Sequence, residues 1–161
     1  MRRRGVHVSS CPACNASFAD GSDTCPVCGW WLDDASPACD AHPETPATGC
    51  CVVCGRPLCE RCEVTEDGVR FCEVPDHREV RRERELLLES ESEFEADWVV
   101  ENLAQNGIMG VMFSAHEFPS TRWTPMRRPA RVFVQKADLA AAREALVRFD
   151  IESTKVPGDA A

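Results

Sequence analysis

Paired metal-binding side chains in the first half of the chain constrain its fold more than any other feature. Ten of the eleven cysteines in the 161-residue sequence, together with two histidines, form six pairs. Five of the six pairs have a two-residue gap, which lets both side chains of a tight turn bind one tetrahedral ion. The pairs are Cys11/Cys14, Cys25/Cys28, Cys39/His42, Cys51/Cys54, Cys59/Cys62 and Cys72/His77. Because a closed site takes two pairs, the sequence predicts three zinc ions that support the fold.

The remaining composition favours a soluble protein of the cytoplasm. Cysteine at this density also occurs in small secreted proteins, where it forms disulfides, but residues 1–8 lack the apolar core of a signal peptide. No apolar run approaches the roughly 20 residues that cross a bilayer. The net charge of -9 disfavours binding to nucleic-acid phosphates. Lysine is rare among the bases, and we interpret this arginine preference as compositional bias.

The first two pairs lie within residues 9–38 and resemble a zinc ribbon. They are separated by ten residues, and the second pair has the Cys-Pro-x-Cys-Gly form of a zinc knuckle. Four thiolates fill every position of one tetrahedral ion, with iron as the alternative metal to zinc. The apolar residues that follow, Trp30, Trp31 and Leu32, form either a recognition surface or a cap on the small core. A core of this size depends on its metal, which favours the cap.

Residues 39–78 carry the other four pairs, enough for two sites. Only four residues separate Cys54 from Cys59, which is short for a loop that returns to the same ion, so we expect alternate pairs to share an ion. One site then uses Cys39, His42, Cys59 and Cys62, and the other uses Cys51, Cys54, Cys72 and His77. The order and spacing from Cys39 to Cys62 resemble the bacterial B-box type zinc finger. That resemblance implies a cross-braced fold related to the RING domain.

Two positions in this segment leave alternatives open. The gap between Cys72 and His77 is longer than in the other pairs, so Asp76 or a water could replace His77 as a ligand. Cys50 is adjacent to Cys51, but Cys51 keeps the two-residue gap to Cys54. We therefore expect Cys50 not to bind metal.

The rest of the chain predicts a charged linker and an α+β domain. Residues 79–84 are a mixed run of arginine and glutamate without an apolar face, which indicates a solvated linker, helical in the alternative. Within residues 85–156 we expect a strand at 86–88, a helix that begins at the capping box of Ser92, and a left-handed stop at Gly107. Strands at 108–113 and 130–134, a helix at 137–149 and a strand at 151–156 follow. This order predicts a ferredoxin-like βαββαβ fold, with both helices on one face of an antiparallel sheet.

Two stretches of this domain resemble a prokaryotic signal-transducing family related in fold to the PII regulators. They are the helix that leads into Asn106-Gly107-Ile108, and Arg131-Val132-Phe133-Val134 with the alanine-rich helix after it. In PII regulators the loop between the middle strands binds partners. The matching loop, residues 114–129, forms with Arg131 and Lys136 the one basic stretch of an acidic chain. It either binds a partner protein or an anionic ligand, through His116, Phe118, Arg122, Trp123, Arg127 and Arg128, or is an ordinary loop packed on the sheet.

These patterns together predict a protein without catalytic activity. Spacing supports no nucleophile, no positioned base and no open metal position. We expect a zinc-binding adaptor or regulatory protein that mediates protein–protein interaction in signal transduction. The alternative is a regulator that binds nucleic acid through the zinc ribbon and its arginine-rich start. Ubiquitin-ligase-type activity is a weaker alternative, because it rests on analogy with the RING fold alone.

Overall fold

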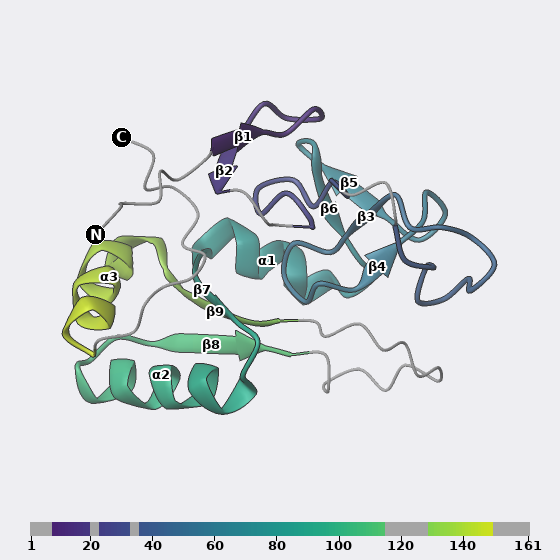
Figure 1. Ribbon diagram of the computed structural model, residues 1–161. Helices are drawn as coiled ribbons and strands as arrows, with labels where there is room; N and C mark the ends of the chain where they lie inside the picture. Colours follow the sequence, from purple (N-terminus) through teal and green to yellow (C-terminus); the bar gives the residue numbers. More distant parts are fainter. Residues whose placement is uncertain (1–7, 20–22, 33–35, 115–128, 150–161) are drawn as a thin grey trace, which may run out of the picture.

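A cysteine-rich half packs against a half built from one sheet and its helices (Figure 1). The computed structural model describes residues 8–19, 23–32, 36–114 and 129–149. The cysteine-rich half contains three short antiparallel ladders: β1 (Val8–Ser10) with β2 (Ser17–Ala19), β3 (Gly49–Cys50) with β4 (Pro57–Leu58), and β5 (Val64–Glu66) with β6 (Val69–Phe71). Strands this short do not hold a fold alone, so the turns between them must supply stability in another way.

The second half begins where helix α1 (Pro75–Glu83) leads directly into strand β7 (Arg84–Ser90). Helix α2 (Glu93–Gln105) and strand β8 (Gly110–Phe113) follow. The last elements are strand β9 (Ala130–Gln135), the short 3-10 helix η2 (Lys136–Asp138) and helix α3 (Leu139–Arg148). The strands form a sheet in the order β7-β9-β8, and both pairings are antiparallel. Strands β7 and β8 therefore run in the same direction, joined through α2, with β9 inserted between them. The result is a mixed α/β structure.

Local signals place the ends of α2 as the sequence predicts. Ser92 is the N-cap, and its side chain accepts a hydrogen bond from the backbone N–H of Glu95, which confirms the capping interaction. Gly107 has φ of 76°, the left-handed conformation expected after the helix. Strand β8 starts at Gly110, two residues later than expected, and β7 is longer than the apolar run that predicted it. The expected last strand, 151–156, lies outside the described residues.

The run at 79–84, expected as a charged linker, forms the end of α1 and the first residue of β7. Its arginines and glutamates are half-buried or exposed, but Val80 packs against the core beneath the cysteine-rich half. The helical part of the expectation agrees with α1. Val80 and the buried His77, one turn before it, form the inward face of α1.

Strand β9 is the centre of the molecule because both faces of it are buried. Val132 and Val134 belong to one core with the inward faces of α2 and α3, which include Val99, Leu103 and Leu146. Phe133 points the other way, into a second core shared with the cysteine-rich half. A change of register between Leu86 and Leu88 of β7 sends Leu86 to the second core and Leu87 and Leu88 to the first.

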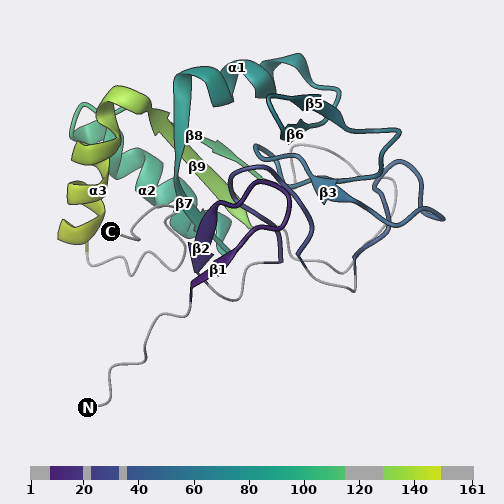
Figure 2. The ribbon, with the colours of Figure 1, turned by 90° about the horizontal axis from the view of Figure 1, so that it is seen from above.

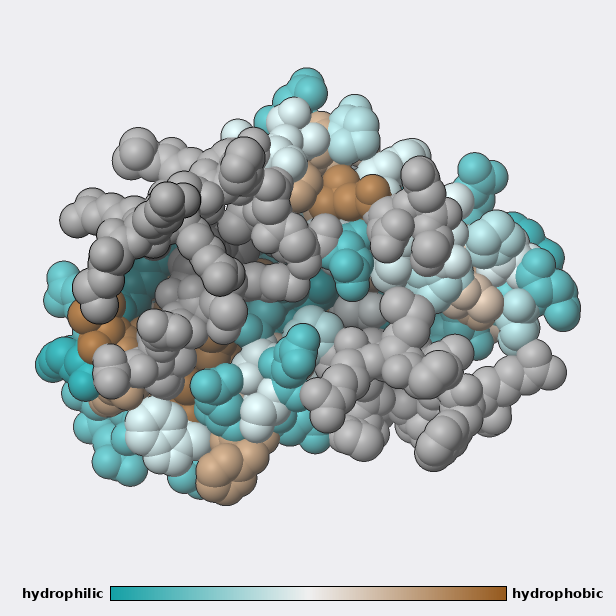
Figure 3. Space-filling view, viewed as in Figure 1, coloured by the Kyte–Doolittle hydropathy of each residue, from teal (hydrophilic) through white to brown (hydrophobic). Residues whose placement is uncertain are grey.

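The sheet is thus covered on one face by helices and on the other by metal-binding residues. Seen from above, α2 and α3 lie on the side of the sheet away from β3, β5 and β6 (Figure 2). Apolar atoms, tan and brown, gather at the lower left of Figure 3. Two apolar side chains of the helices are largely exposed, Phe94 of α2 and Val147 of α3. Within the described ranges, no helix is both long and apolar enough to cross a membrane.

Candidate metal centres

Twelve cysteine and histidine side chains gather into three groups of four. The ligand atoms of each group all lie within 4.8 Å of one another. The first cluster is Cys11, Cys14, Cys25 and Cys28; the second is Cys39, His42, Cys59 and Cys62; the third is Cys51, Cys54, Cys72 and His77. These groups match the three ligand sets expected from the spacing, including the alternate pairing in residues 39–78.

The distances between ligand atoms fit a zinc ion. Zinc bound tetrahedrally at about 2.3 Å from sulfur places two sulfur ligands about 3.8 Å apart. The Sγ atoms are 3.6 Å apart for Cys11 and Cys28, 3.7 Å for Cys14 and Cys25, and 3.7 Å for Cys39 and Cys62. All eleven cysteines are free thiols, and these separations are far longer than the roughly 2.05 Å of a disulfide. The donor sets therefore suit three metal ions rather than disulfides.

Both histidines present Nδ1 to their clusters. Nδ1 of His42 lies 3.5 Å from Sγ of Cys59 and 3.2 Å from Sγ of Cys62. Nδ1 of His77 lies 3.1 Å from Sγ of Cys72 and 3.5 Å from Sγ of Cys51. Of the two candidates for the last position of the third cluster, His77 is buried among the cysteines and Asp76 is exposed. The first turn of α1 thus compensates for the longer gap by bringing His77 back to Cys72.

The first cluster is shaped by the knuckle that ends at Gly29. The backbone N–H of Gly29 donates to the carbonyl oxygen of Cys25, and φ of Gly29 is 76°. A Cβ at this position would collide with the carbonyl oxygen of Cys50, so the close approach of the two segments requires glycine. Trp30 and Leu32 pack against the cluster, which supports the interpretation of these residues as a cap on a small core.

Two arginines connect the clusters through acidic residues that directly follow a metal ligand. Arg70 lies over the ring of Trp30, beside the first cluster, and its Nε is 2.9 Å from a carboxylate oxygen of Glu63, which follows Cys62. Arg56 pairs with Asp40, which follows Cys39, at 3.1 Å, and with Glu73, which follows Cys72, at 2.6 Å. Arg70 therefore joins the first cluster to the second, and Arg56 joins the second to the third.

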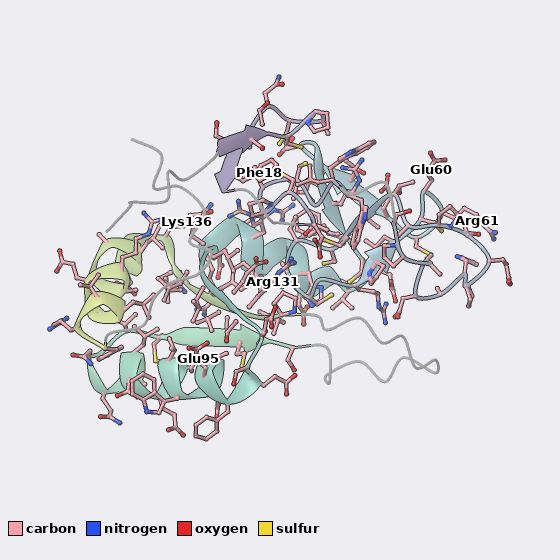
Figure 4. The ribbon with its side chains drawn as sticks, viewed as in Figure 1. Phe18, Glu60, Arg61, Glu95, Arg131 and Lys136 are labelled. Atoms are coloured by element: carbon pink, nitrogen blue, oxygen red, sulfur yellow. The ribbon has the colours of Figure 1, made fainter. Side chains whose placement is uncertain are left out.

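A third arginine, Arg131 of β9, connects the third cluster to the sheet. Its Nε donates to a carboxylate oxygen of Glu89 in β7 at 2.7 Å, and its Nη1 donates to the carbonyl oxygen of Cys51 at 2.9 Å. The Arg131 side chain is only 5% exposed, and Figure 4 shows it in the interior, between the sheet and the cysteine-rich half. The sequence grouped Arg131 with the basic stretch around the loop at 114–129, but the structure buries its side chain. The sequence did offer one sign of burial, because Arg131 is the single charged residue in the apolar run 130–134.

Cys50, the cysteine outside the three clusters, is buried beside the third one. It belongs to no group of ligand atoms, as expected. Burial raises the pKa of its thiol, although the nearby charge of Arg131 acts in the opposite direction. A buried and protonated thiol is chemically inert, which favours a packing role for Cys50.

Burial and contacts between neighbouring ligands shift the pKa values of the metal-binding side chains. Burial and the neighbouring thiols raise the pKa of Cys62 to about 12, and burial raises that of Cys25 to about 11. Burial also opposes ionisation of Cys39, but backbone N–H groups of the second cluster outweigh it and lower its pKa to about 6. For His77, burial is outweighed by hydrogen bonds to Cys51 and Cys72, which raise its pKa to about 9. Without metal, several ligands therefore carry protons at neutral pH.

Metal binding is expected to release protons and to weaken as the pH falls. A thiol whose pKa is raised above its ordinary value stays protonated at neutral pH, and zinc must displace that proton before it binds the thiolate. Lower pH therefore favours the metal-free state, and the affinity for zinc should fall as the pH drops below the raised pKa values of Cys62, Cys25 and His77, which are about 12, 11 and 9. Zinc titration in weakly buffered solution with a pH indicator measures the protons released. Cys50→Ser should release the same number, and binding without proton release would contradict the assignment.

The residues expected to bind a partner lie outside the described residues. These are His116, Phe118, Arg122, Trp123, Arg127 and Arg128, all within 115–128. The structure does place the residues on either side of this stretch. Phe113 ends β8 and Ala130 begins β9, at the same end of two neighbouring strands.

Comparison with known protein families, with curated proteins and with solved structures finds no match for this chain. The three clusters and the sheet are therefore interpreted from their own geometry.

Proposed function

We propose that this chain is a non-enzymatic zinc-binding adaptor whose metal centres hold a surface for protein–protein interaction. The observation that carries the proposal is the completeness of the clusters: each has four protein donors, so a tetrahedral zinc has no position left for substrate or water. Catalytic zinc sites keep such a position open. Zinc in all three centres would therefore stabilise structure and leave binding to the surrounding surface.

The module families suggested by the sequence are consistent with this role. We propose a zinc ribbon for the first cluster and a B-box-like cross-brace for the second and third, in which the ligand pairs alternate along the chain. For the second half we propose a ferredoxin-like domain of the signal-transducing type, in which residues 151–156 would add the fourth strand. The zinc modules and the ferredoxin-like domain would all be scaffolds that present surface loops. Metal ions would make the zinc modules rigid, and the sheet would do so in the ferredoxin-like domain.

The proposed binding segment is the loop at 114–129. It carries two aromatic residues and a group of arginines in a chain of net charge -9, which suits an acidic partner protein. It connects β8 to β9, and β9 is buried at five of its six residues. Aromatic and arginine side chains supply most of the binding energy in typical interfaces.

Substitution of two loop residues is expected to abolish partner capture without changing the fold. In Trp123→Ala/Arg127→Ala, loss of one aromatic and one guanidinium anchor should remove at least about 2 kcal/mol of binding energy each. The measurement is capture of the partner from a lysate of the source cells by metal-replete protein, quantified by mass spectrometry. Zinc content and circular dichroism should stay at wild-type values.

A matched control removes the same residue types from another surface. Trp98→Ala/Arg148→Ala changes one tryptophan and one arginine on α2 and α3, both exposed. This control should capture the same partner as the wild type. Equal capture by the loop variant and the wild type would refute the loop as the binding segment. Zinc-dependent catalytic activity of the protein would refute the adaptor role.

A further inference from the structure

The third cluster is built into the sheet half of the protein. Three of its ligands, Cys51, Cys54 and Cys72, share one core with Leu86 of β7 and Phe133 of β9. Its fourth ligand, His77, lies on α1, which runs into β7 without an intervening loop. The first cluster differs, since its core contains only neighbouring residues of its own segment. The third centre therefore shares its packing with strands that follow it in the sequence.

Aromatic contacts extend from the ligand His77 across the sheet. The rings of His77 and Phe113 meet edge to face, with centroids 5.4 Å apart. Phe113, the last residue of β8, makes a similar contact with Phe133 at 5.9 Å. Contacts of this geometry are favourable beyond the apolar area that they bury. A ligand of the third cluster thus touches β8 directly through Phe113, and Phe113 in turn contacts β9 through Phe133.

Arg131 holds the backbone of the same cluster. The carbonyl oxygen of Cys51 accepts hydrogen bonds from Nη1 of Arg131 and from the backbone N–H of Gly55, which closes the Cys51–Cys54 turn. The guanidinium also pairs with Glu89, whose side chain is 10% exposed. Zinc with three thiolates and one neutral imidazole carries a net charge of -1, so Arg131 lies between a buried anionic centre and a buried carboxylate.

We propose that Arg131 is a positioning residue of the third metal centre and that metal binding there and formation of the β7-β9-β8 sheet are a single coupled equilibrium. The coupling follows from the arrangement above: the metal fixes Cys51 and His77, and these two residues contact β9 through Arg131 and β8 through Phe113. Outer residues that orient metal ligands affect affinity strongly even without touching the metal. Coupling is reciprocal, so loss of metal at this centre loosens the sheet and damage to the sheet weakens the metal.

The first test measures zinc affinity in the full-length chain by competition with a chelator of known affinity. In Arg131→Met, the affinity for one of the three ions should be about 10- to 100-fold lower than in the wild type. The affinities for the other two ions should be unchanged. Glu89→Gln, which keeps the arginine but removes its ion pair, should produce a smaller loss from the same ion. Arg131→Lys should also be intermediate, because the ammonium keeps the charge but not the paired geometry.

Two controls separate coupling from general destabilisation. Arg81→Met breaks a less buried arginine–glutamate pair, Arg81 with Glu85 of β7 at 2.7 Å, and should leave the release of all three ions unchanged. In a His77→Ala background, where the third centre has already lost a ligand, Arg131→Met should not affect the two remaining ions. Wild-type zinc affinity at all three sites in both Arg131→Met and Glu89→Gln would overturn the proposal. This holds even if Arg131→Met unfolds the sheet, because coupling predicts that such a loss weakens the metal site.

The second test follows the coupling in the opposite direction by hydrogen exchange. His77→Ala should reduce the protection of backbone amides in β9, such as those of Val132 and Val134, because the coupling acts in both directions. Cys11→Ser/Cys14→Ser, which removes the first centre, should leave β9 protected. Wild-type protection of β9 in His77→Ala protein that has lost one zinc would overturn the proposal.

Discussion

Withdrawing zinc from the protein with a strong chelator is expected to unfold the cysteine-rich half. The ladders there are two or three residues long, and the core of the first cluster consists of three cysteines and a few half-buried neighbours. A structural zinc ion contributes about 10–16 kcal/mol at pH 7 in small zinc-dependent domains. That exceeds or equals the roughly 5–15 kcal/mol by which a whole domain is usually stable. The apolar contacts of this half cannot replace it.

Metal analysis combined with tryptophan fluorescence provides the measurement. Trp30 packs on the first cluster, so its emission should shift towards that of exposed tryptophan as zinc is lost. Three zinc ions per chain are expected before treatment, and restoring zinc under reducing conditions should restore the signal. Cys50→Ser should still bind three ions, since Cys50 belongs to no cluster. A chain that keeps its fluorescence and circular dichroism after complete loss of metal would contradict a structural role for the ions.

The ligand sets were predictable because the spacing of metal-binding pairs is a local property of the chain. A two-residue gap determines which side chains share a turn, and the short segment between Cys54 and Cys59 points to alternate pairing. The N-cap at Ser92 and the glycine after α2 are local for the same reason, and both occur as expected, although the N–H of Ser92 donates to Ser90 and not to Glu95 as in a full capping box. These features require only neighbours along the sequence.

The connections between the clusters were not predictable, because each one joins residues far apart in the chain. The sequence showed an excess of arginine, which we interpreted as compositional bias. In the structure Arg70, Arg56 and Arg131 each link a metal centre to the next part of the protein. The bond from Arg131 to Cys51 spans 80 positions. Only the folded arrangement distinguishes such an arginine from one on the surface.

The way the two halves share a core was missed for a similar reason. The apolar run at Leu86–Leu88 indicated a buried strand, but no periodicity showed that its side chains divide between two cores. The register change in β7 produces that division. Strand β9 alternates instead, with Val132 and Val134 towards the helices and Phe133 towards the metal ligands. Since both faces of β9 carry buried apolar side chains, its sequence resembles that of other central strands, and the partner on the second face is not visible in it.

Replacement of Phe133 by alanine should therefore cause one of the largest losses of stability available to a single apolar substitution. The side chain is 1% exposed and fills the space between the central strand, Phe113 and the core shared with the third cluster. Truncation of a buried phenylalanine costs about 3–5 kcal/mol, through lost burial and the cavity that remains. Denaturant unfolding of the zinc-loaded protein, followed by circular dichroism, measures this change in the free energy of unfolding.

Phe94→Ala provides the matched control, because it makes the same substitution at a phenylalanine that is 82% exposed on α2. It should change the free energy of unfolding by no more than about 0.5 kcal/mol. Similar losses for both variants would show that Phe133 does not occupy the shared core. A large loss for Phe133→Ala alone is the expected result, because Phe133 packs in the core that the metal centre and the sheet share.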